Sequence, residues 1–438
     1  MKLKTFPGGL HPPDNKHYTA HVPIADCTLP PELVIPLSQH IGAPAEACVA
    51  VGELVGKGQM VGRARGFVSV PVHASTSGEV VAVEDRPHPS GHALPAVVIR
   101  PDGADAWIDG LAGADPETLD ANALRERIRD AGIVGLGGAT FPTHVKLNPP
   151  GDKRIDTLIL NGVECEPFLT ADHRLMLEEP TRILDGVTIL RRILGVERVA
   201  IGIEANKPDA IETLGRACAG SGIEVVALAV KYPQGAEKQL IAAVTGREVP
   251  SGGLPMDVGV VVQNVGTAAA VSTTLRTGQP LIERVVTVSG PALADPQNLR
   301  VRVGTPLKHL LESCGGTKVA PAKIVMGGPM MGTALLGLEA PVVRGTSGLL
   351  LFGPGEFPRQ PEGPCIRCGR CVRVCPAHIL PTTIAAFARL DLIAEAESFD
   401  AMDCIECGCC TYTCPAAIPL VQAIRQAKGA ILAKRRKV

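Results

Sequence analysis

Two cysteine runs near the end of the chain constrain its fold more than any other feature. The eight cysteines of these runs are Cys365, Cys368, Cys371, Cys375, Cys404, Cys407, Cys410 and Cys414. In each run the gaps are two, two and three residues, and a proline follows the last cysteine. A secreted disulfide scaffold would be shorter and would space its cysteines more evenly. Thiols clustered in this way are typical of metal ligands, so we predict a metal-binding segment.

The spacing is similar to that of bacterial ferredoxins with two [4Fe–4S] clusters, in which the fourth cysteine ligates the other cluster. We therefore predict one cluster on Cys365, Cys368, Cys371 and Cys414. We predict the second cluster on Cys404, Cys407, Cys410 and Cys375. A structural zinc site is the alternative, but zinc leaves the second copy and the trailing Cys-Pro unexplained. Cys409 adjoins Cys410, and the repeat spacing favours Cys410 as the ligand.

The rest of the composition bounds the class of protein. A chain of 438 residues with 45 % hydrophobic and 20 % charged residues predicts two to four globular domains. The net charge of −1 gives no basic field that would favour nucleic acid as a partner. The sequence has no uninterrupted apolar stretch of the roughly 18–20 residues that a membrane helix needs. It also begins without the apolar core of a signal peptide, so we expect a soluble or peripheral protein on the cytoplasmic side.

The first part of the chain predicts little helix. Residues 1–30 are rich in proline, histidine and glycine, which favours extended and turn structure. Residues 31–112 contain short apolar runs separated by glycine turns, which predicts β-strands, for example at 34–37, 47–51, 80–83 and 97–99. Two predicted hairpins, 51–59 and 71–80, resemble the lipoyl and biotinyl barrel-sandwich family. Thr76-Ser77-Gly78 stands where that family carries its modified lysine, so we expect a docking or scaffold module.

The middle of the chain alternates between helical and strand patterns. Residues 113–280 are therefore expected to form an α/β domain with helices over a sheet. The predicted helices are 116–131, 181–194 and 210–219, and the predicted strands are 156–160, 198–203 and 225–228.

The last third is rich in β patterns and then in cysteine. Apolar runs at 284–289 and 323–326 flank a predicted helix at 306–314, which favours a β-grasp, SLBB-like module over 281–350. Proline and glycine predict a linker at 351–363. The two-cluster ferredoxin domain is expected at 364–424, with a basic tail at 425–438. The fold class is thus multidomain, α/β plus β.

A glycine-rich loop follows the first predicted helix of the α/β domain. It runs from Gly132 to Pro142, and Lys146 comes shortly after it. Glycine lets backbone N–H groups approach a phosphate closely. The loop alone is weak evidence for a nucleotide site, because it follows a helix instead of a strand and Pro142 interrupts what comes next.

Three later segments strengthen that evidence. The loop resembles the flavin-binding loop of the NADH-oxidising subunit of respiratory complex I. The segments similar to that family, in the same order, are Asn-Gly-Val-Glu-Cys-Glu-Pro at 161–167, Tyr-Pro-Gln-Gly-Ala-Glu at 232–237 and Asn-Val-Gly-Thr at 264–267. Four motifs in order over about 130 residues are specific together.

This resemblance implies a non-covalent FMN site with NADH as substrate. The implied cofactor-binding residues are Gly135, Gly137, Gly138, Ala139, Lys146, Asn161, Glu164, Tyr232, Gly235, Glu237, Asn264, Val265 and Thr267. Glu164 and Glu166 are the implied catalytic residues, with Glu166 at the nicotinamide-nucleotide contacts. The phenylalanine that the family pattern has around 250–255 is absent. The sequence therefore supports FMN binding more strongly than NADH binding.

The order of modules across nearly the whole chain resembles the RnfC family, the C subunits of Rnf ion-translocating electron-transport complexes. Residues 8–16, Gly-Gly-Leu-His-Pro-Pro-Asp-Asn-Lys, look like the opening signature of that family. The resemblance implies a peripheral NADH:acceptor oxidoreductase subunit of a translocase on the cytoplasmic face of the inner membrane. Its partners would be the other Rnf-type subunits, NAD(H), and ferredoxin or flavodoxin through the complex. Partner subunits would couple the electron flow to Na⁺ or H⁺ transport.

The implied chemistry is the conversion of a two-electron hydride from NADH into single electrons for the clusters, with flavin as the converter. One alternative is a cobalamin reductase of the propanediol-utilisation type, in which we would expect the flavin domain to come first. A second alternative is a flavin-free iron–sulfur conduit that keeps the α/β domain as a scaffold.

Overall fold

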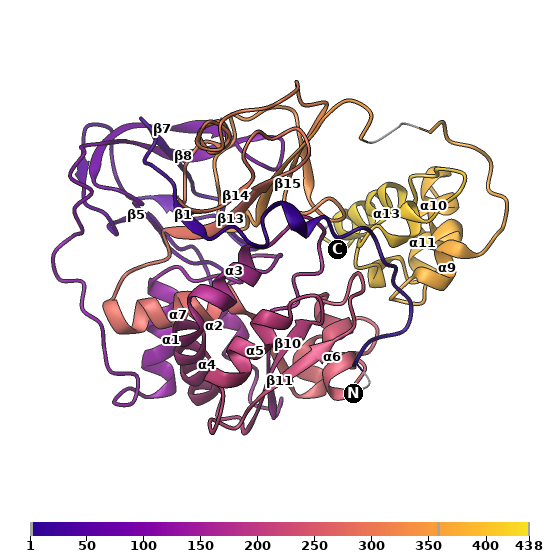
Figure 1. The fold of residues 1–438 in the computed structure, drawn as a ribbon, viewed down its shortest axis with the longest axis horizontal. Helices are drawn as coiled ribbons and strands as arrows, with labels where there is room; N and C mark the ends of the chain where they lie inside the picture. Colours follow the sequence, from indigo (N-terminus) through magenta and orange to yellow (C-terminus); the bar gives the residue numbers. More distant parts are fainter. Residues whose placement is uncertain (1–2, 357–359, 437–438) are drawn as a thin grey trace.

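The computed structural model describes residues 3–356 and 360–436 of the chain. Figure 1 shows a barrel of short strands beside a mixed sheet, an α/β unit below both, and a helical unit at one end. Within the described ranges, no helix is both long and apolar enough to cross a bilayer.

The barrel is a sandwich of two antiparallel sheets, ordered β2-β8-β7-β4 and β3-β5-β6. Its strands are β2 (Leu33–Pro36), β3 (Glu46–Ala47), β4 (Leu54–Val55), β5 (Met60–Arg63), β6 (Val72–His73), β7 (Gly78–Pro87) and β8 (Ala93–Pro101). Of the strand predicted at 47–51, only residue 47 lies in a strand, β3. Thr76 and Ser77 are buried, and the Ser75 hydroxyl donates to the carbonyl of Val303 in the neighbouring module at 2.6 Å.

The α/β unit is built on a parallel sheet ordered β11-β10-β9-β12. Its strands are β9 (Thr157–Asn161), β10 (Arg198–Glu204), β11 (Ile223–Leu228) and β12 (Val260–Asn264). Its helices are α1 (Ala121–Asp130), α2 (Thr143–Lys146), α3 (Ala171–Glu178), α4 (Pro180–Leu194), α5 (Pro208–Ala217), α6 (Glu237–Thr245), η2 (Pro255–Val258) and α7 (Val265–Thr277). Alternate strand residues enter two separate cores, so helices cover both faces, as parallel sheets require.

Helix α1 starts later than the sequence pattern predicts. The predicted start is residue 116, but the helix begins after Asp120, whose side chain accepts a hydrogen bond from the Ala123 N–H at 2.8 Å. A turn closed by Asp115 precedes it. An aspartate cap satisfies an otherwise orphaned N–H group and fixes where the helix starts.

The SLBB-like module is a six-stranded sheet ordered β1-β14-β13-β17-β15-β16. Its elements are β1 (Ile24–Asp26), β13 (Glu283–Ser289), β14 (Gln297–Arg302), α8 (Leu307–Ser313), β15 (Lys323–Met326), β16 (Thr333–Leu335) and β17 (Gly348–Phe352). Strand β1 comes from the N-terminal segment and pairs in parallel with β14, a pairing that the sequence did not predict. Strand β17 extends two residues past the expected boundary at 350.

The C-terminal helical unit carries both cysteine runs. Its elements are α9 (Arg370–Val374), α10 (Pro381–Arg389), α11 (Ile393–Ser398), η3 (Ala401–Asp403), α12 (Cys409–Tyr412) and α13 (Leu420–Arg435). The prediction of a basic tail over 425–438 is wrong for residues 425–435, which belong to α13. This helix buries Ile424, Ala427 and Ile431 in the core of the unit. Of the predicted linker and tail, residues 357–359 and 437–438 lie outside the described residues.

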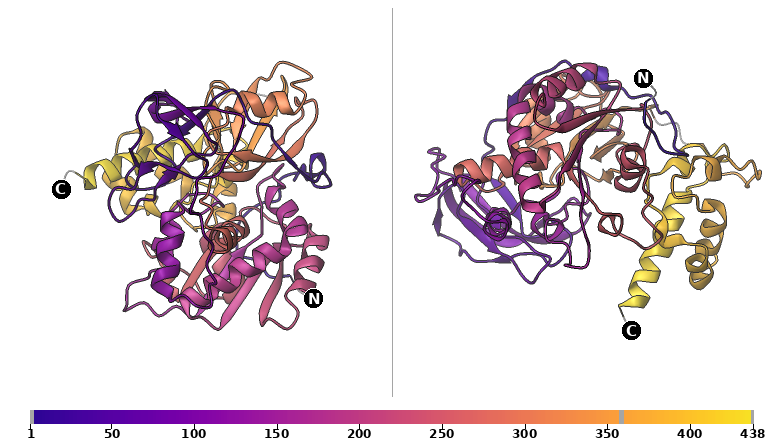
Figure 2. Two further views of the ribbon diagram at one scale, coloured as in Figure 1. Left: turned by 90° about the vertical axis from the view of Figure 1, so that its left-hand side faces the viewer. Right: turned by 90° about the horizontal axis from the view of Figure 1, so that it is seen from below.

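The N-terminal segment acts as a strap, defined here as residues 4–26, that touches three of the bodies. It contains one short helical turn, η1 (Lys16–Tyr18). Lys4 pairs with the end of β11, the Gly9 N–H donates to the carbonyl of Val374 at 2.8 Å, and β1 joins the SLBB-like sheet. Figures 1 and 2 show this indigo segment passing from the α/β unit along the helical unit and across to the mixed sheet.

Candidate functional site

The candidate flavin site lies where the order of the parallel strands reverses. The chain runs from β9 to β10 and β11 on one side and returns to β12 on the other. Asn161 and Asn264 end β9 and β12 and are register partners across this switch point. Ligands of open α/β sheets bind at the carboxyl ends of the strands at such a point.

The glycine-rich loop covers this switch point. The Leu136 N–H donates to the Thr267 hydroxyl at 2.9 Å, which fixes the loop to the first turn of α7. A Cβ on Gly137 would come within 3.0 Å of Asn264, whereas one on Gly138 would meet open space. Asn264 caps α7, so the positive end of this helix points toward the loop. Exposed glycine amides beside a helix N-terminus make a cradle for a phosphate, and this arrangement fits FMN.

The other predicted motifs converge on the same place. The Lys146 ammonium donates to Glu237 at 2.7 Å and to the Val262 carbonyl at 2.8 Å. The Asn161 amide donates to the Gly235 carbonyl at 2.8 Å. Ala139 is exposed on the loop, and Val265 is buried at the start of α7. All four motifs, far apart in sequence, are thus joined by direct contacts.

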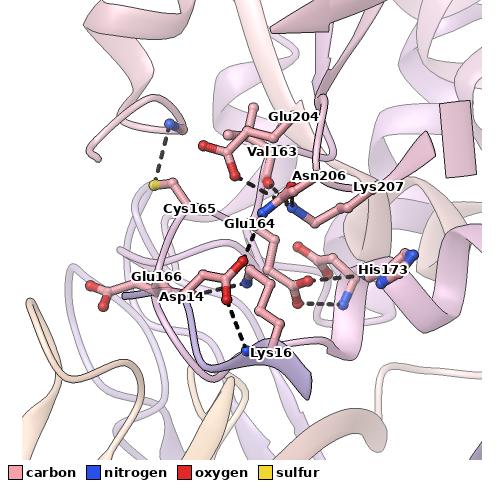
Figure 3. Close-up of polar contacts among 12 residues, drawn as sticks. Asp14, Lys16, Val163, Glu164, Cys165, Glu166, His173, Glu204, Asn206 and Lys207 are labelled. Carbon is pink, nitrogen blue, oxygen red and sulfur yellow. Dashed lines mark hydrogen bonds and ion pairs between the residues drawn. The ribbon is translucent and has the colours of Figure 1, made fainter. Parts of the chain in front are cut away.

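The Glu164 carboxylate is held within the chain (Figure 3). It accepts hydrogen bonds from the N–H groups of Asp172 and His173, at 2.8 and 3.2 Å, and so caps the start of α3. The Asp172 carboxylate in turn accepts from the Asn264 amide at 2.7 Å. A catalytic role for Glu164 stays a prediction. In the structure, Glu164 is connected to Asn264 through Asp172, whose N–H donates to Glu164 and whose carboxylate accepts from Asn264.

A buried ion pair supports the loop that carries Glu164. The Lys207 side chain is 0 % exposed and the Glu204 side chain 2 %, and the two charges are 3.4 Å apart. The Lys207 ammonium also donates to the Val163 carbonyl at 2.8 Å, as Figure 3 shows. On the other side of the loop, Lys16 of the strap donates to the carbonyls of Glu166 and Leu169. Burial lowers the pKa of Lys16, with the charge of Lys207 acting in the same direction.

Glu166 faces the SLBB-like module. Its carboxylate accepts from the N–H groups of Met330 and Met331 at 3.0 and 2.9 Å. Burial raises the pKa of Glu166 to about 7. Its predicted contact with a nicotinamide nucleotide is untested; in the structure this side chain joins two modules.

Tyr232 connects the flavin-type domain to the helical unit. The buried Tyr232 hydroxyl donates to the carbonyl of Cys407 at 2.8 Å, and the Cys409 thiol lies 3.9 Å from the Tyr232 carbonyl oxygen. Cys165 packs in the same apolar cluster and accepts from the Gly235 N–H at 3.4 Å. Nearby, the Gln239 amide donates to the Pro376 carbonyl at 3.1 Å. The second cysteine run therefore rests directly against the flavin motifs.

The cysteines surround two cavities of the helical unit. One cavity, of about 210 Å³, is lined by Cys365, Cys368, Cys371 and Cys414. The other, of about 20 Å³, is lined by Cys375, Cys404, Cys407, Cys409 and Cys410. In the described part of the chain, no three His, Cys, Asp or Glu side chains are gathered closely enough to hold a single metal ion. Thiols placed around a cavity fit a [4Fe–4S] cluster. As in two-cluster ferredoxins, each cavity is lined by the last cysteine of the other run, Cys414 or Cys375.

The two cluster loops repeat the same backbone. The N–H of Arg367 points to the Cys365 sulfur at 3.5 Å, and the N–H of Glu406 points to the Cys404 sulfur at 3.4 Å. Both donors have left-handed φ angles, 55° and 58°. Backbone donors to the thiolate sulfurs stabilise their negative charge and are one of the levers that set cluster potentials. The loops thus fit [4Fe–4S] clusters.

The hydroxyl of Tyr232 offers a direct test of the domain contact. We expect Tyr232→Phe to lower the free energy of unfolding by about 1–3 kcal/mol, because the Cys407 carbonyl loses a buried donor. Thermal melts of the loaded protein measure the change. Tyr412→Phe is the matched control, because Tyr412 is 56 % exposed, and it should cost less than about 0.5 kcal/mol. Equal losses in both variants would contradict a structural role for the Tyr232 hydrogen bond.

The Asp172 carboxyl should make stability depend on pH. Burial, together with the charge of Glu164, raises the pKa of Asp172 to about 7 from its usual 3.8. The folded state then holds this proton more tightly than the unfolded state, so the free energy of unfolding falls as pH rises from about 4 to 7. We expect Asp172→Asn to be more stable than the parent above pH 7 by about 2–4 kcal/mol. Denaturant titrations at pH 5 and 8 measure this difference, and a gap that is the same at both pH values would contradict it. Asp152→Asn, at an exposed aspartate, controls for the loss of one charge.

Two residues at the site, Asp172 and Lys16, were not among the predicted site residues. Asp172 stood outside the quoted motifs, and only its position shortly after Glu166 offered a signal. Lys16 was part of the opening signature, but no local pattern indicated that its side chain would reach the loop after β9. Its partners lie 150 or more positions away in sequence.

Four families match successive parts of the chain. Residues 4–104 match the RnfC barrel sandwich hybrid domain, and residues 128–273 match the Nuo51 FMN-binding domain. Residues 285–334 match the SLBB domain, and residues 364–418 match the 4Fe-4S dicluster domain. The predicted fold class is confirmed. FMN and iron–sulfur clusters are the cofactors that these domains carry.

Curated relatives match along the whole chain. The chain is 50 % identical to the C subunit of the proton-translocating ferredoxin:NAD(+) oxidoreductase complex of Clostridium ljungdahlii, over 97 % of this chain and 94 % of that protein. It is 50 % identical to the C subunit of the Na(+)-translocating ferredoxin:NAD(+) oxidoreductase complex of Acetobacterium woodii, over 100 % and 99 %. It is 47 % identical to the C subunit of the ion-translocating oxidoreductase complex of Pseudomonas aeruginosa, over 100 % of this chain but 57 % of that longer protein.

Among solved structures, the fold is similar to a chain of an NAD⁺-reducing [NiFe]-hydrogenase in its H2-reduced state. The TM-score is 0.50 at 20 % identity, covering 74 % of this chain and 65 % of the other. This likeness supports the fold alone.

Proposed function

The chain belongs to the RnfC family of Rnf-type electron-transport complexes, and we propose that it exchanges electrons between NAD(H) and the other subunits on the cytoplasmic side of the membrane. As a member it is an electron-transfer oxidoreductase subunit. Our proposal adds that partner subunits couple this flow to Na⁺ or H⁺ transport and to ferredoxin. Both ions occur in the names of relatives at equal identity, so the proposal covers either.

The observation that carries this proposal is the contact between the flavin motifs and the second cysteine run. Asn161 contacts Gly235, and Tyr232 of the same motif contacts the Cys407 carbonyl. The loop at 250–255 also faces the helical unit, since Ser251 donates to Asp403 at 2.5 Å. We propose that the cluster held by Cys404, Cys407, Cys410 and Cys375 is the one nearest the flavin, and that the other cluster lies farther along the route.

When bound, FMN would supply the conversion between two-electron hydride chemistry and single electrons. Gly137, Gly138 and the start of α7 would hold its phosphate. Asn161 and Asn264 pair across the ends of β9 and β12 and fix the sheet edge at this site. The junction around Tyr232 and Cys165 is a packed apolar cluster that includes Cys407 of the second cysteine run.

Anaerobic titration with NADH tests the proposal. Flavin absorbance should bleach first, and low-temperature EPR should then show reduced clusters. Bound flavin and dithionite-reducible clusters that fail to respond to NADH would overturn the NADH assignment. Complete absence of bound flavin after reconstitution would favour the iron–sulfur conduit.

A further inference from the structure

The repeat of the two cluster loops allows their outer faces to be compared position by position. Gly369 and Gly408 occupy equivalent positions with φ angles of 70° and 76°. Ile366 corresponds to Ile405 and Arg370 to Cys409 in the same register. The two loops therefore present equivalent faces, although their side chains differ.

The face of the second loop is covered by the rest of the chain. Ile405 and the fully buried Cys409 pack in an apolar cluster with Tyr232 and Met330. A Cβ on Gly408 would lie 3.3 Å from the Met330 carbonyl oxygen. This loop therefore faces the flavin-type domain and the SLBB-like module.

The equivalent face of the first loop is bare. Ile366 is 65 % exposed, and Cys365, Cys368 and Gly369 are exposed as well. Helix α9, which follows the loop, lies on the outer side of the helical unit in Figure 1. The same backbone that forms an internal contact in the second repeat thus faces solvent in the first.

Three arginines lie on or next to this bare loop. Arg367, Arg370 and Arg373 are all exposed, and Arg367 and Arg370 line the larger cavity. Over the described ranges, the structure gives none of them an ion-pair partner. By contrast, Glu406, the counterpart of Arg367, is paired with Arg425 and Lys428 at 2.8 and 2.6 Å. Among the described residues, no carboxylate pairs with the positive charge of the first loop, in contrast to the second.

We propose that the first cluster loop, residues 365–373, is the docking surface for a one-electron carrier protein whose face around its own cofactor is acidic. The inference rests on the proposed function in one respect, that electrons leave through the cluster farther from the flavin. Ile366 would supply the apolar centre of the contact, and the arginines its charged rim. A rim of one sign speeds and orients the approach of an oppositely charged partner. A protein fits better than a lipid surface, because two of the arginines line the cavity of the cluster loop instead of one side of a long amphipathic helix.

An acidic flavodoxin serves as the probe, used with the full chain and its cofactors reconstituted. The clusters are reduced with light and deazaflavin, so the result does not depend on whether NADH binds. Binding of oxidised flavodoxin and its rate of reduction are measured between about 20 and 500 mM salt. We expect Arg367→Glu/Arg370→Glu/Arg373→Glu to lower the second-order rate at low salt by about tenfold or more and to flatten its salt dependence.

The control carries the same change of charge elsewhere. Arg65→Glu/Arg100→Glu/Arg216→Glu alters three exposed arginines of the barrel and of α5, and we expect less than about a twofold effect, because charges beyond a Debye length are screened. Arg373→Glu alone, outside the cavity lining, is the second variant if the triple change loses a cluster. It should reduce flavodoxin binding by a smaller factor in the same direction.

Three outcomes would overturn the proposal. The first is equal losses in the two triple variants. The second is an unchanged affinity for flavodoxin with a shifted reduction potential in EPR titrations, which would assign the arginines to tuning the cluster alone. The third is arginine-dependent binding to phosphatidylglycerol vesicles without flavodoxin binding, which would assign this face to the membrane. A chain that fails to oxidise NADH but retains arginine-dependent flavodoxin binding would leave the docking surface supported.

Discussion

Replacing Cys375 with alanine is expected to remove the cluster of the other cysteine run and to keep the cluster of its own. Cys375 lines the cavity that Cys404, Cys407 and Cys410 surround, and the dicluster spacing predicts the same crossing. Half of the bound iron should therefore be lost. NADH-driven reduction of the remaining cluster should fall by at least about a hundredfold, because the cluster nearest the flavin is missing. Mutations of residues that only hydrogen-bond to metal ligands already lower activity about 10–100-fold.

Iron analysis, EPR and flavin bleaching measure these three effects in one sample. Cys414→Ala is the mirror variant: it should lose the other cluster and leave one that NADH still reduces. Cys409→Ala is the matched control in the same cavity and should keep both clusters. If Cys375→Ala left a cluster that NADH reduces and Cys414→Ala did not, the order of the clusters would be reversed.

Replacing Lys207 with methionine is expected to destabilise the chain by about 3–5 kcal/mol. The change leaves the carboxylate of Glu204, 2 % exposed, buried without its cation. The carbonyl of Val163 also loses its donor. Because Val163 lies between Asn161 and Glu164, the loop after β9 should loosen and FMN should bind more weakly.

Chemical denaturation and flavin release measure both effects. The double variant Lys207→Met/Glu204→Gln removes both charges and should recover part of the lost stability, because the two sites are coupled. Arg216→Met removes an exposed cation and should change stability by less than about 0.5 kcal/mol. A double variant as unstable as the sum of the two single ones would rule out the buried pair as the cause.

Local chemistry made much of the architecture predictable. Strands such as β9 and β10 are apolar runs buried on both faces, and their predicted bounds differ from the observed ones by about one residue. The cysteine spacing predicted which thiols would share a cavity, since a fixed loop geometry determines that grouping.

Long-range contacts were not predictable in the same way. Nothing near Ile24 indicates that it pairs with Asn298 of β14. Tyr232 was predicted at the flavin and Glu166 at the nicotinamide nucleotide. The structure adds partners that the sequence did not indicate, namely the Cys407 carbonyl for Tyr232 and the 330–331 backbone for Glu166. Such partners depend on how modules dock, and docking leaves no periodic pattern in a single sequence.

The strap also determines the order in which the chain can be completed during synthesis. Its partners include Val374 of the helical unit and Asn298 of the SLBB-like sheet, which a ribosome makes hundreds of residues after Gly9. Contacts between such distant positions form slowly, because a long loop must close before they form. The strap contacts with the α/β unit, such as those of Lys16 with the carbonyls of Glu166 and Leu169, can form earlier, whereas the contact of Gly9 with Val374 requires almost the whole chain. Complete closure of the N-terminal strap is thus a late event of folding, because its last partner, Val374, belongs to the helical unit.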